Sequence, residues 1–153
     1  MNRYFIIVIF FLTASLLLSA STTKKIYIFY GPYCCVDCFK KMKVSSDSLL
    51  KNKIVDSVIV ISRTRNNALL KKLIKRDVSK LFPDYPIIFE YIDEDDPWPP
   101  KDLVGGFFGK YNVSITPTVL FFNGDKETFI SYQTLYKYDF NLIKIIKDKN
   151  ILK

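Results

Sequence analysis

Three cysteines lie close together in the run Tyr33-Cys34-Cys35-Val36-Asp37-Cys38. Cys35 and Cys38 have the Cys-x-x-Cys spacing, which suits dithiol–disulfide exchange, half of a zinc site or a structural disulfide. A closed zinc site would need two more ligands, and the chain offers only Cys34 and no histidine. A structural disulfide that closes so small a loop would restrict the unfolded chain very little. Redox exchange is therefore our leading hypothesis, and the other two remain alternatives.

The cysteines fall at a predicted junction between a strand and a helix. Residues 26–30 form a short apolar run typical of a buried strand. Residues 36–51 have an amphipathic helical pattern, in which Ser45-Ser46-Asp47-Ser48 are weak helix formers that predict a break or kink. A helix N-terminus stabilises a thiolate, so this position favours redox chemistry. The candidate core contacts of the helix are Phe39, Met42, Leu49 and Leu50.

Further along the chain, strand and helix patterns alternate. We expect strands at residues 56–62 and 87–92 with a helix at 66–82 between them. Residues 93–100 form an acidic, proline-rich loop, in which we expect Trp98 to anchor local packing. After it we expect a helix at 101–111, strands at 119–122 and 127–132 around an Asn123-Gly124 hairpin turn, and one closing helix at 138–152. The order βαβαβαββα predicts an α/β fold with three layers.

Composition narrows the class of protein. The chain has 153 residues, 49% of them hydrophobic, which is enough for one domain with a real core and argues against disorder. The net charge of +8 comes mainly from scattered lysines without a compact basic cluster, so we expect no nucleic-acid partner. The absence of histidine excludes histidine-based acid–base catalysis and most metal sites.

The first residues have the pattern of an export signal. Arg3 precedes an apolar run at residues 4–18, and the small residues Ser19-Ala20-Ser21 follow it. An apolar run of about 15 residues fits a signal peptide better than a membrane span of about 20. We therefore predict a signal peptide at residues 1–20, with a retained membrane anchor as the alternative, and a domain at residues 21–153. Export to the periplasm or another extracytoplasmic compartment would let disulfides form and persist.

A second motif makes the Cys-x-x-Cys pair more specific. Thr116-Pro117-Thr118 precedes a predicted hairpin strand, and together with Cys35 and Cys38 it resembles the thioredoxin superfamily. The resemblance extends from residue 26 to the C-terminus and implies a thioredoxin-like three-layer α/β/α fold with a mixed central sheet. The extra strand–helix unit at residues 56–82 is similar to the exported TlpA-like or ResA-like branch. Other matching features are Phe29-Tyr30, the segment at 111–122 and the Asn123-Gly124 turn.

The resemblance also implies roles for individual residues. Cys35 would be the attacking thiolate and Cys38 the buried resolving thiol of a redox-active disulfide. Pro117 would be a cis-proline against that disulfide, and Thr116 would offer backbone hydrogen bonds to a bound peptide. We therefore expect a monomeric reductase of protein disulfides that needs no cofactor or metal and takes electrons from a membrane or extracytoplasmic thiol donor. The alternatives are an oxidase or isomerase on the same fold, or a non-catalytic binding module.

The chain departs from the family pattern at three places. Cys34 occupies a position that is usually aromatic, and it is either an unreactive small side chain or a third redox thiol. The strand at 26–30 carries no acid to accept a proton, and we expect Glu90 to be a solvated edge carboxylate rather than a substitute. Asp37 should oppose a thiolate at Cys35 and so favour a reductant, although Lys40 and Lys41 act in the other direction.

Overall fold

The computed structural model describes residues 23–31, 35–92 and 106–152. Within these ranges, no helix is both long enough and apolar enough to cross a membrane. The predictions for the signal peptide at 1–20, for Cys34 and for Trp98 lie outside the described residues.

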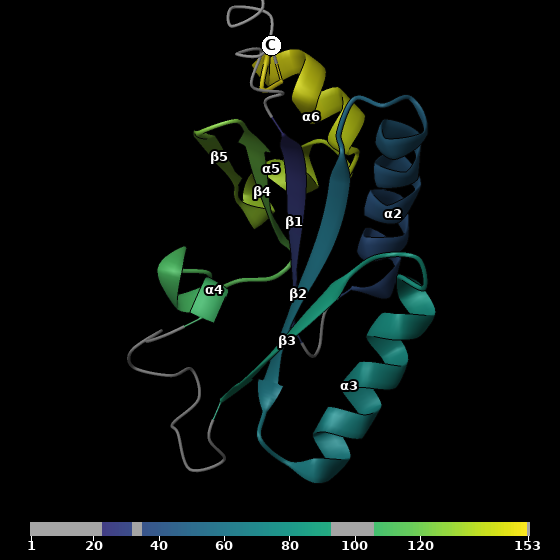
Figure 1. Ribbon diagram of the computed structural model, residues 1–153, viewed down its shortest axis with the longest axis vertical. Helices are drawn as coiled ribbons and strands as arrows, with labels where there is room; N and C mark the ends of the chain where they lie inside the picture. Colours follow the sequence, from purple (N-terminus) through teal and green to yellow (C-terminus); the bar gives the residue numbers. More distant parts are fainter. Residues whose placement is uncertain (1–22, 32–34, 93–105, 153) are drawn as a thin grey trace, which may run out of the picture.

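Five strands form one mixed sheet in the order β3-β2-β1-β4-β5 (Figure 1). The central strand β1 is parallel to β2 and antiparallel to β4, β3 adds parallel to β2, and β4 and β5 form an antiparallel hairpin. The predicted mixed sheet is therefore confirmed. The strands cover Lys24–Tyr30 (β1), Ser57–Arg65 (β2), Ile87–Ile92 (β3), Thr118–Asn123 (β4) and Lys126–Ile130 (β5).

Helices cover both faces of this sheet and give the predicted three layers. The helices cover Val36–Lys51 (α2), Ala68–Leu81 (α3), Gly106–Lys110 (α4), Tyr132–Lys137 (α5) and Leu142–Lys149 (α6). Side chains of β1 alternate between the faces, as the pleat of a strand requires. Ile26 and Ile28 face the larger core with α2, α3, α5 and α6, whereas Phe29 faces a smaller core with Phe108 of α4. Tyr30, the last residue of β1, therefore lies at the end of the central strand, shortly before the cysteine motif.

The predicted break in α2 is wrong, because the helix is continuous from Val36 to Lys51. Ser45 and Ser46 are buried within it, and Ser45 also contacts α6. The Ser45 hydroxyl donates to the carbonyl of Met42 at 2.9 Å and accepts the N–H of Leu142 at 3.2 Å. The Ser45 side chain is small, and its hydroxyl forms a hydrogen bond within α2, so α6 can begin close to α2.

The turn before β3 is also fixed to α2. The Tyr85 hydroxyl donates to Asp47 at 2.6 Å, and Lys43 pairs with Asp47 at 2.7 Å. Burial of the ring together with this hydrogen bond raises the pKa of the Tyr85 phenol. Burial opposes ionisation of Asp47, but the hydrogen bonds from Lys43 and Tyr85 outweigh it and lower the pKa of the carboxyl. These contacts hold the extra strand–helix unit against the helix that carries the cysteines.

The closing helix expected at 138–152 is present but shorter, because α6 covers Leu142–Lys149, and the helix α5, which the sequence did not predict, precedes it. Asp139 and Phe140 have φ values of 50° and 57°, which break the helical path between α5 and α6. Ser131 caps α5 and Asn141 caps α6 through side-chain oxygens, so each helix has its own start signal. β5 accordingly ends at Ile130 rather than at Tyr132. Of the helix expected at 101–111, the described part is α4, which ends at Lys110.

Candidate functional site

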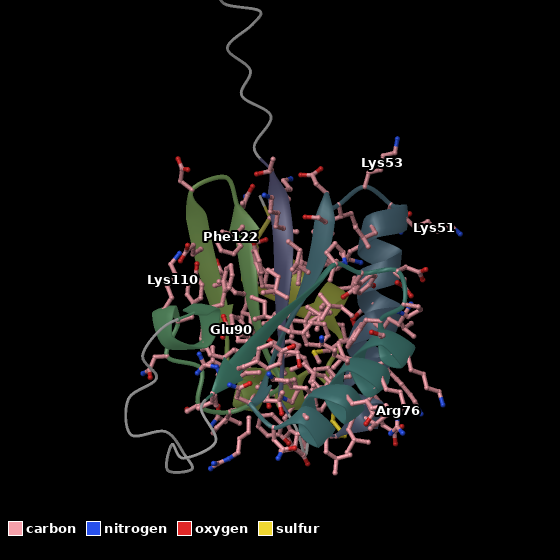
Figure 2. The ribbon with its side chains drawn as sticks, turned by 60° about the horizontal axis from the view of Figure 1, so that its bottom comes forward. Lys51, Lys53, Arg76, Glu90, Lys110 and Phe122 are labelled. Atoms are coloured by element: carbon pink, nitrogen blue, oxygen red, sulfur yellow. A yellow bond between two sulfur atoms is a disulfide. The ribbon has the colours of Figure 1, made fainter. Side chains whose placement is uncertain are left out.

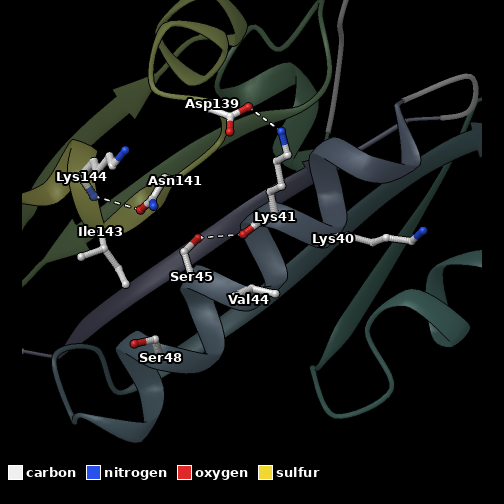
Figure 3. Close-up of a pocket in the computed structure, with 9 residues that line it drawn as sticks. All are labelled: Lys40, Lys41, Val44, Ser45, Ser48, Asp139, Asn141, Ile143 and Lys144. Atoms are coloured by element: carbon white, nitrogen blue, oxygen red, sulfur yellow. Dashed lines mark hydrogen bonds and ion pairs between the residues drawn. The ribbon is translucent and has the colours of Figure 1, made fainter.

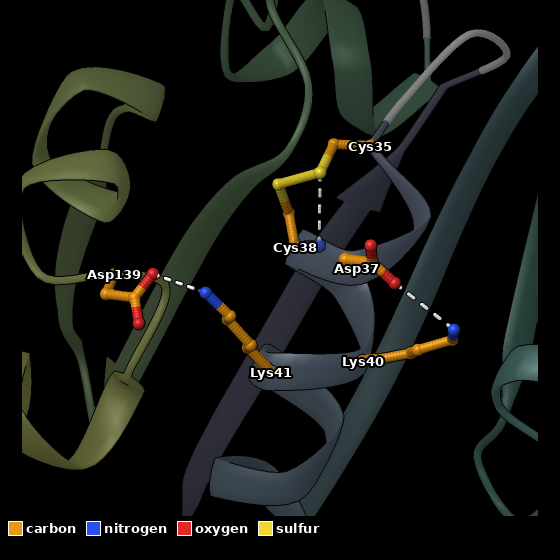
Figure 4. Close-up of a disulfide and its surroundings, with 6 residues drawn as sticks. All are labelled: Cys35, Asp37, Cys38, Lys40, Lys41 and Asp139. Carbon is orange, nitrogen blue, oxygen red and sulfur yellow. Dashed lines mark hydrogen bonds and ion pairs between the residues drawn. A yellow bond between two sulfur atoms is a disulfide. The ribbon is translucent and has the colours of Figure 1, made fainter.

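Cys35 and Cys38 form a disulfide at the N-terminus of α2, with their Cα atoms 5.3 Å apart (Figure 4). Cys35 is the N-cap residue, and its sulfur accepts the backbone N–H of Cys38 at 3.2 Å. Cys35 is exposed, whereas Cys38 is only 7% exposed and belongs to the larger core. An external thiol or disulfide can therefore reach the sulfur of Cys35 more easily than that of Cys38.

The exposed charges beside the disulfide are paired. Lys40 lies 3.2 Å from Asp37, and Lys41 lies 2.5 Å from Asp139 at the start of the α5–α6 turn (Figure 4). Both lysines come from the first turns of α2, where the sequence analysis expected them to favour a thiolate. Because each cation is paired with a carboxylate, the net charge that they bring to Cys35 is small. The helix N-terminus is then the main feature that would stabilise a Cys35 thiolate.

The structure brings the Thr116-Pro117 segment close to the end of β1. The peptide bond between Thr116 and Pro117 is cis, and Pro117 is buried. A Cβ atom at Gly31 would lie 2.6 Å from Oγ1 of Thr116, so the two residues are in close contact and Gly31 must stay small. Gly31 follows β1 directly and precedes Cys35 by four positions in the sequence. The two motifs therefore lie near the same end of the central strand.

Glu90 is not the solvated edge carboxylate that we expected. Its side chain is 12% exposed and pairs with Arg63 of β2 at 3.1 Å (Figure 2). It also accepts the backbone N–H groups of Phe107 and Phe108 at the start of α4. These contacts lie on the α4 face of the sheet, whereas Cys38 packs in the core on the opposite face. Glu90 is therefore a structural acid and does not act on the disulfide.

The sequence carries a signal for the pairing of Glu90 with Arg63. Arg63 is opposite Glu90 in the parallel β2–β3 register, and its guanidinium lies over the ring of Phe108 at 4.8 Å. The predicted strand ends at residue 62, but residues 63–65 continue β2. A cation that follows a buried strand and an acid within the next strand together indicate a buried pair.

Two grooves flank α2, one on each side. We call the first the α2–α3 groove; it has a volume of about 510 Å³ and is lined by Tyr30, Val36, Lys40, Asp77, Lys80 and Leu81. The second, of about 480 Å³, lies between α2 and the start of α6 and includes Lys41, Val44 and Ile143 (Figure 3). Only the α2–α3 groove is lined by Val36, the residue that follows Cys35. It therefore begins one residue after Cys35 in the chain.

Among the described residues, no group of three or more histidine, cysteine, aspartate or glutamate side chains is placed to hold a metal ion.

The sheet order, the disulfide after the central strand and the cis-proline before β4 together define the thioredoxin-like fold. The chain has this fold. A thioredoxin-like protein from Porphyromonas gingivalis is similar in structure, with a TM-score of 0.51, 17% identity, and coverage of 82% of this chain and 74% of that one. No protein-family model matches the sequence, and no curated protein matches it.

Two further solved structures are similar at lower TM-scores. One is a secreted disulfide oxidoreductase of Mycobacterium tuberculosis, described as homologous to DsbE of Escherichia coli, with a TM-score of 0.49, 17% identity, and coverage of 80% of this chain and 85% of that one. The other is the N-terminal domain of PilB from Neisseria meningitidis, with a TM-score of 0.49, 14% identity, and coverage of 86% and 85%. Both of these TM-scores are below 0.5, so the fold assignment rests on the sheet order, the site geometry and the similarity to the Porphyromonas gingivalis protein.

Proposed function

We propose that this protein is an exported thiol–disulfide oxidoreductase that reduces disulfides in other proteins. The observation that carries the proposal is the asymmetry of the Cys35–Cys38 pair. One sulfur is exposed at the N-terminus of α2, and the other is buried beneath it. A helix N-terminus stabilises the attacking thiolate of Cys35, and the buried thiol of Cys38 can then resolve the mixed disulfide.

In the proposed reaction, the reduced protein transfers two electrons to its substrate. The Cys35 thiolate attacks one sulfur of a substrate disulfide, and the other substrate sulfur leaves as a thiolate. The Cys38 thiolate then attacks the Cys35 sulfur of this mixed disulfide and releases the second substrate thiolate. The products are a substrate dithiol, after uptake of two protons, and the Cys35–Cys38 disulfide. A membrane or extracytoplasmic thiol donor would return the two electrons.

Thr116 and Pro117 are proposed to hold the substrate chain during this exchange. Their support is the contact between Thr116 and Gly31, which lies between β1 and the cysteine motif. Thr116 would offer backbone hydrogen bonds to an extended substrate segment, and Pro117 would shape the surface beside it. Residues 1–20 are proposed to direct export, because an oxidising compartment is where protein disulfides form and persist.

Trapping of the mixed disulfide tests the proposed roles of the cysteines. The Cys38→Ser and Cys35→Ser variants are reduced, mixed with insulin as the disulfide probe and examined by mass spectrometry. We expect a covalent adduct with Cys38→Ser that dithiothreitol releases, and none with Cys35→Ser, because Cys35 is exposed and Cys38 is buried.

The third cysteine is controlled by making both variants with and without Cys34→Ser. An adduct that survives in Cys35→Ser and disappears when Cys34 is also replaced would show that Cys34 is the nucleophile. Failure of every variant and of the native protein to react with insulin would overturn the proposal in favour of a non-catalytic binding module.

A further inference from the structure

The α2–α3 groove begins at Val36, the residue after Cys35, and is partly apolar. Val36 is 51% exposed although it directly follows Cys35, where a polar residue would suit a solvated helix N-terminus better. Leu81 from the end of α3 and Tyr30 from the end of β1 complete the apolar part of the lining. An apolar side chain of a bound molecule could cover Val36 and remove this surface from water.

The charges around the groove leave one cation unpaired. Lys40 is paired with Asp37, and Asp77 is paired with Arg76. Lys80 has no ion-pair partner in the part of the chain that the structure describes. The groove therefore combines an apolar surface with a net positive charge at Lys80, and a carboxylate complements it.

The groove lies on the opposite side of Cys35 from the Thr116-Pro117 segment. β2 and β4 are the two neighbours of β1, and Thr116-Pro117 leads into β4. α3 packs against β2, on the other side of β1. A substrate polypeptide that contacts both Thr116 and the α2–α3 groove must therefore pass over Cys35. Its own disulfide then lies beside Cys35, as thiol–disulfide exchange requires.

We propose that the α2–α3 groove binds the segment of a protein substrate next to its reacting cysteine, and selects segments with an apolar residue and a carboxylate. The apolar side chain covers Val36 and Leu81, and the carboxylate lies near Lys80. This inference rests on the proposed reductase function and names the class of substrate for it.

Two peptide disulfides test the selection by charge. Both carry a leucine beside the reacting cysteine, followed by glutamate in one peptide and lysine in the other. The measured quantity is the second-order rate constant for their reduction by the reduced protein. We expect the native protein to reduce the glutamate peptide about fivefold faster than the lysine peptide, which is the size of effect that one exposed ion pair can give. Lys80→Glu should abolish or reverse this preference.

The matched control is Lys149→Glu, which makes the same change of net charge at an exposed position near the end of α6. We expect this variant to keep the native preference within about twofold, since its charge lies outside the groove. Equal effects of Lys80→Glu and Lys149→Glu would overturn the proposal, because the preference would then come from the net charge alone.

A third peptide with glycine in place of leucine tests the apolar contact. The preference is the ratio of the rate constants for the leucine and glycine peptides. Val36→Ser should reduce this ratio by about threefold, because the leucine then loses about half of the apolar surface that covers it. An unchanged preference in Val36→Ser would contradict the apolar part of the proposal.

Reduction of hydroxyethyl disulfide separates failure of the groove from failure of the function. This probe is neutral and too small to contact the groove, so the rate of each variant with a peptide is divided by the rate of the same variant with this probe. If the native protein does not react with it, the proposed reductase function fails. If all variants react with it and peptide selection does not depend on Lys80 or Val36, the groove proposal alone fails.

Discussion

At the scale of single residues, the ion pair between Asp37 and Lys40 decides how much charge Cys35 experiences. The carboxylate lies two positions after Cys35, and its partner amine is 3.2 Å away. Both side chains are exposed, so solvent screens the pair and neither charge is fully cancelled. The negative charge of Asp37 is the one closer to Cys35 in sequence, and it opposes the effect of the helix N-terminus.

The variant Asp37→Asn is expected to make Cys35 more reactive. Loss of the carboxylate removes a repulsion and frees Lys40, so the thiolate fraction of Cys35 should rise. We predict that the alkylation rate of Cys35 by iodoacetamide at pH 7 increases by about threefold in the reduced protein. The measurement uses the Cys34→Ser background and peptide mass spectrometry to assign the alkylated cysteine.

Asp125→Asn serves as the control, because Asp125 is an exposed acid in the β4–β5 turn. Its effect on the alkylation rate should be within experimental error. If Asp37→Asn and Asp125→Asn give the same rate, Asp37 does not restrain the reactivity of Cys35.

Sequence reasoning could find the cysteine pair but not every partner of its neighbours. The spacing of Cys35 and Cys38 is local, and so is the i,i+3 relation of Asp37 and Lys40. The pairs Lys41–Asp139 and Arg63–Glu90 join residues far apart in the chain, so they depend on helix packing and strand register. Neither of these is determined by a local pattern.

At the scale of elements, Glu90 joins two strands to the start of α4. It pairs with Arg63 on the neighbouring strand and accepts two backbone N–H groups of α4. Gly106 has a φ of 60°, and a Cβ atom there would collide with the Glu90 carboxylate. α4 has five residues, which is too short to be stable alone, so these contacts hold it on the sheet.

Glu90→Gln is therefore expected to destabilise the whole domain. The change leaves the guanidinium of Arg63, whose side chain is 10% exposed, without its charged partner. Loss of one member of a buried pair costs about 3 kcal/mol of the free energy of unfolding, and urea denaturation at pH 7 would measure it.

The control for this prediction is Glu127→Gln, at an exposed carboxylate of β5 that lies 3.9 Å from Lys110. An exposed pair of this kind contributes less than about 1 kcal/mol. Equal urea midpoints for the two variants would show that Glu90 does not carry the stability that its burial implies.

The element boundaries that sequence reasoning missed have physical causes. Residues 63–65 are polar, yet they continue β2 because Glu90 and the neighbouring residues of β3 pair with them. The helix α5 has only six residues and follows β5 almost directly, so its residues show too short a period to predict a helix. The cap residues Ser131 and Asn141 were the available signals for two helices.

At the scale of the whole molecule, the order of elements was predictable because it follows from local patterns and general rules of connection. Parallel strands need crossover helices, and the Asn123-Gly124 turn requires an antiparallel neighbour. The same order places the cysteines at the end of the central strand β1, where α2 begins. The grooves beside α2 were not predictable, because they arise from the spacing between helices that are distant in sequence.

The direction of electron transfer is also a property of the whole molecule, since it depends on the difference in stability between the oxidised and reduced proteins. A strong oxidant has a reduced form that its fold stabilises through the thiolate. In this protein the cations near Cys35 are paired with carboxylates, and Asp37 opposes the helix N-terminus. The fold should therefore stabilise the reduced form only weakly, as in a reductant.

The reduction potential of the Cys35–Cys38 couple tests this claim most directly. The protein is equilibrated in dithiothreitol or glutathione redox buffers at pH 7, and alkylation followed by mass spectrometry gives the reduced fraction. We predict a potential near the thioredoxin value of about −270 mV. A potential near the DsbA value of about −120 mV, or a pair that does not equilibrate with the buffers, would contradict the assignment as a reductant.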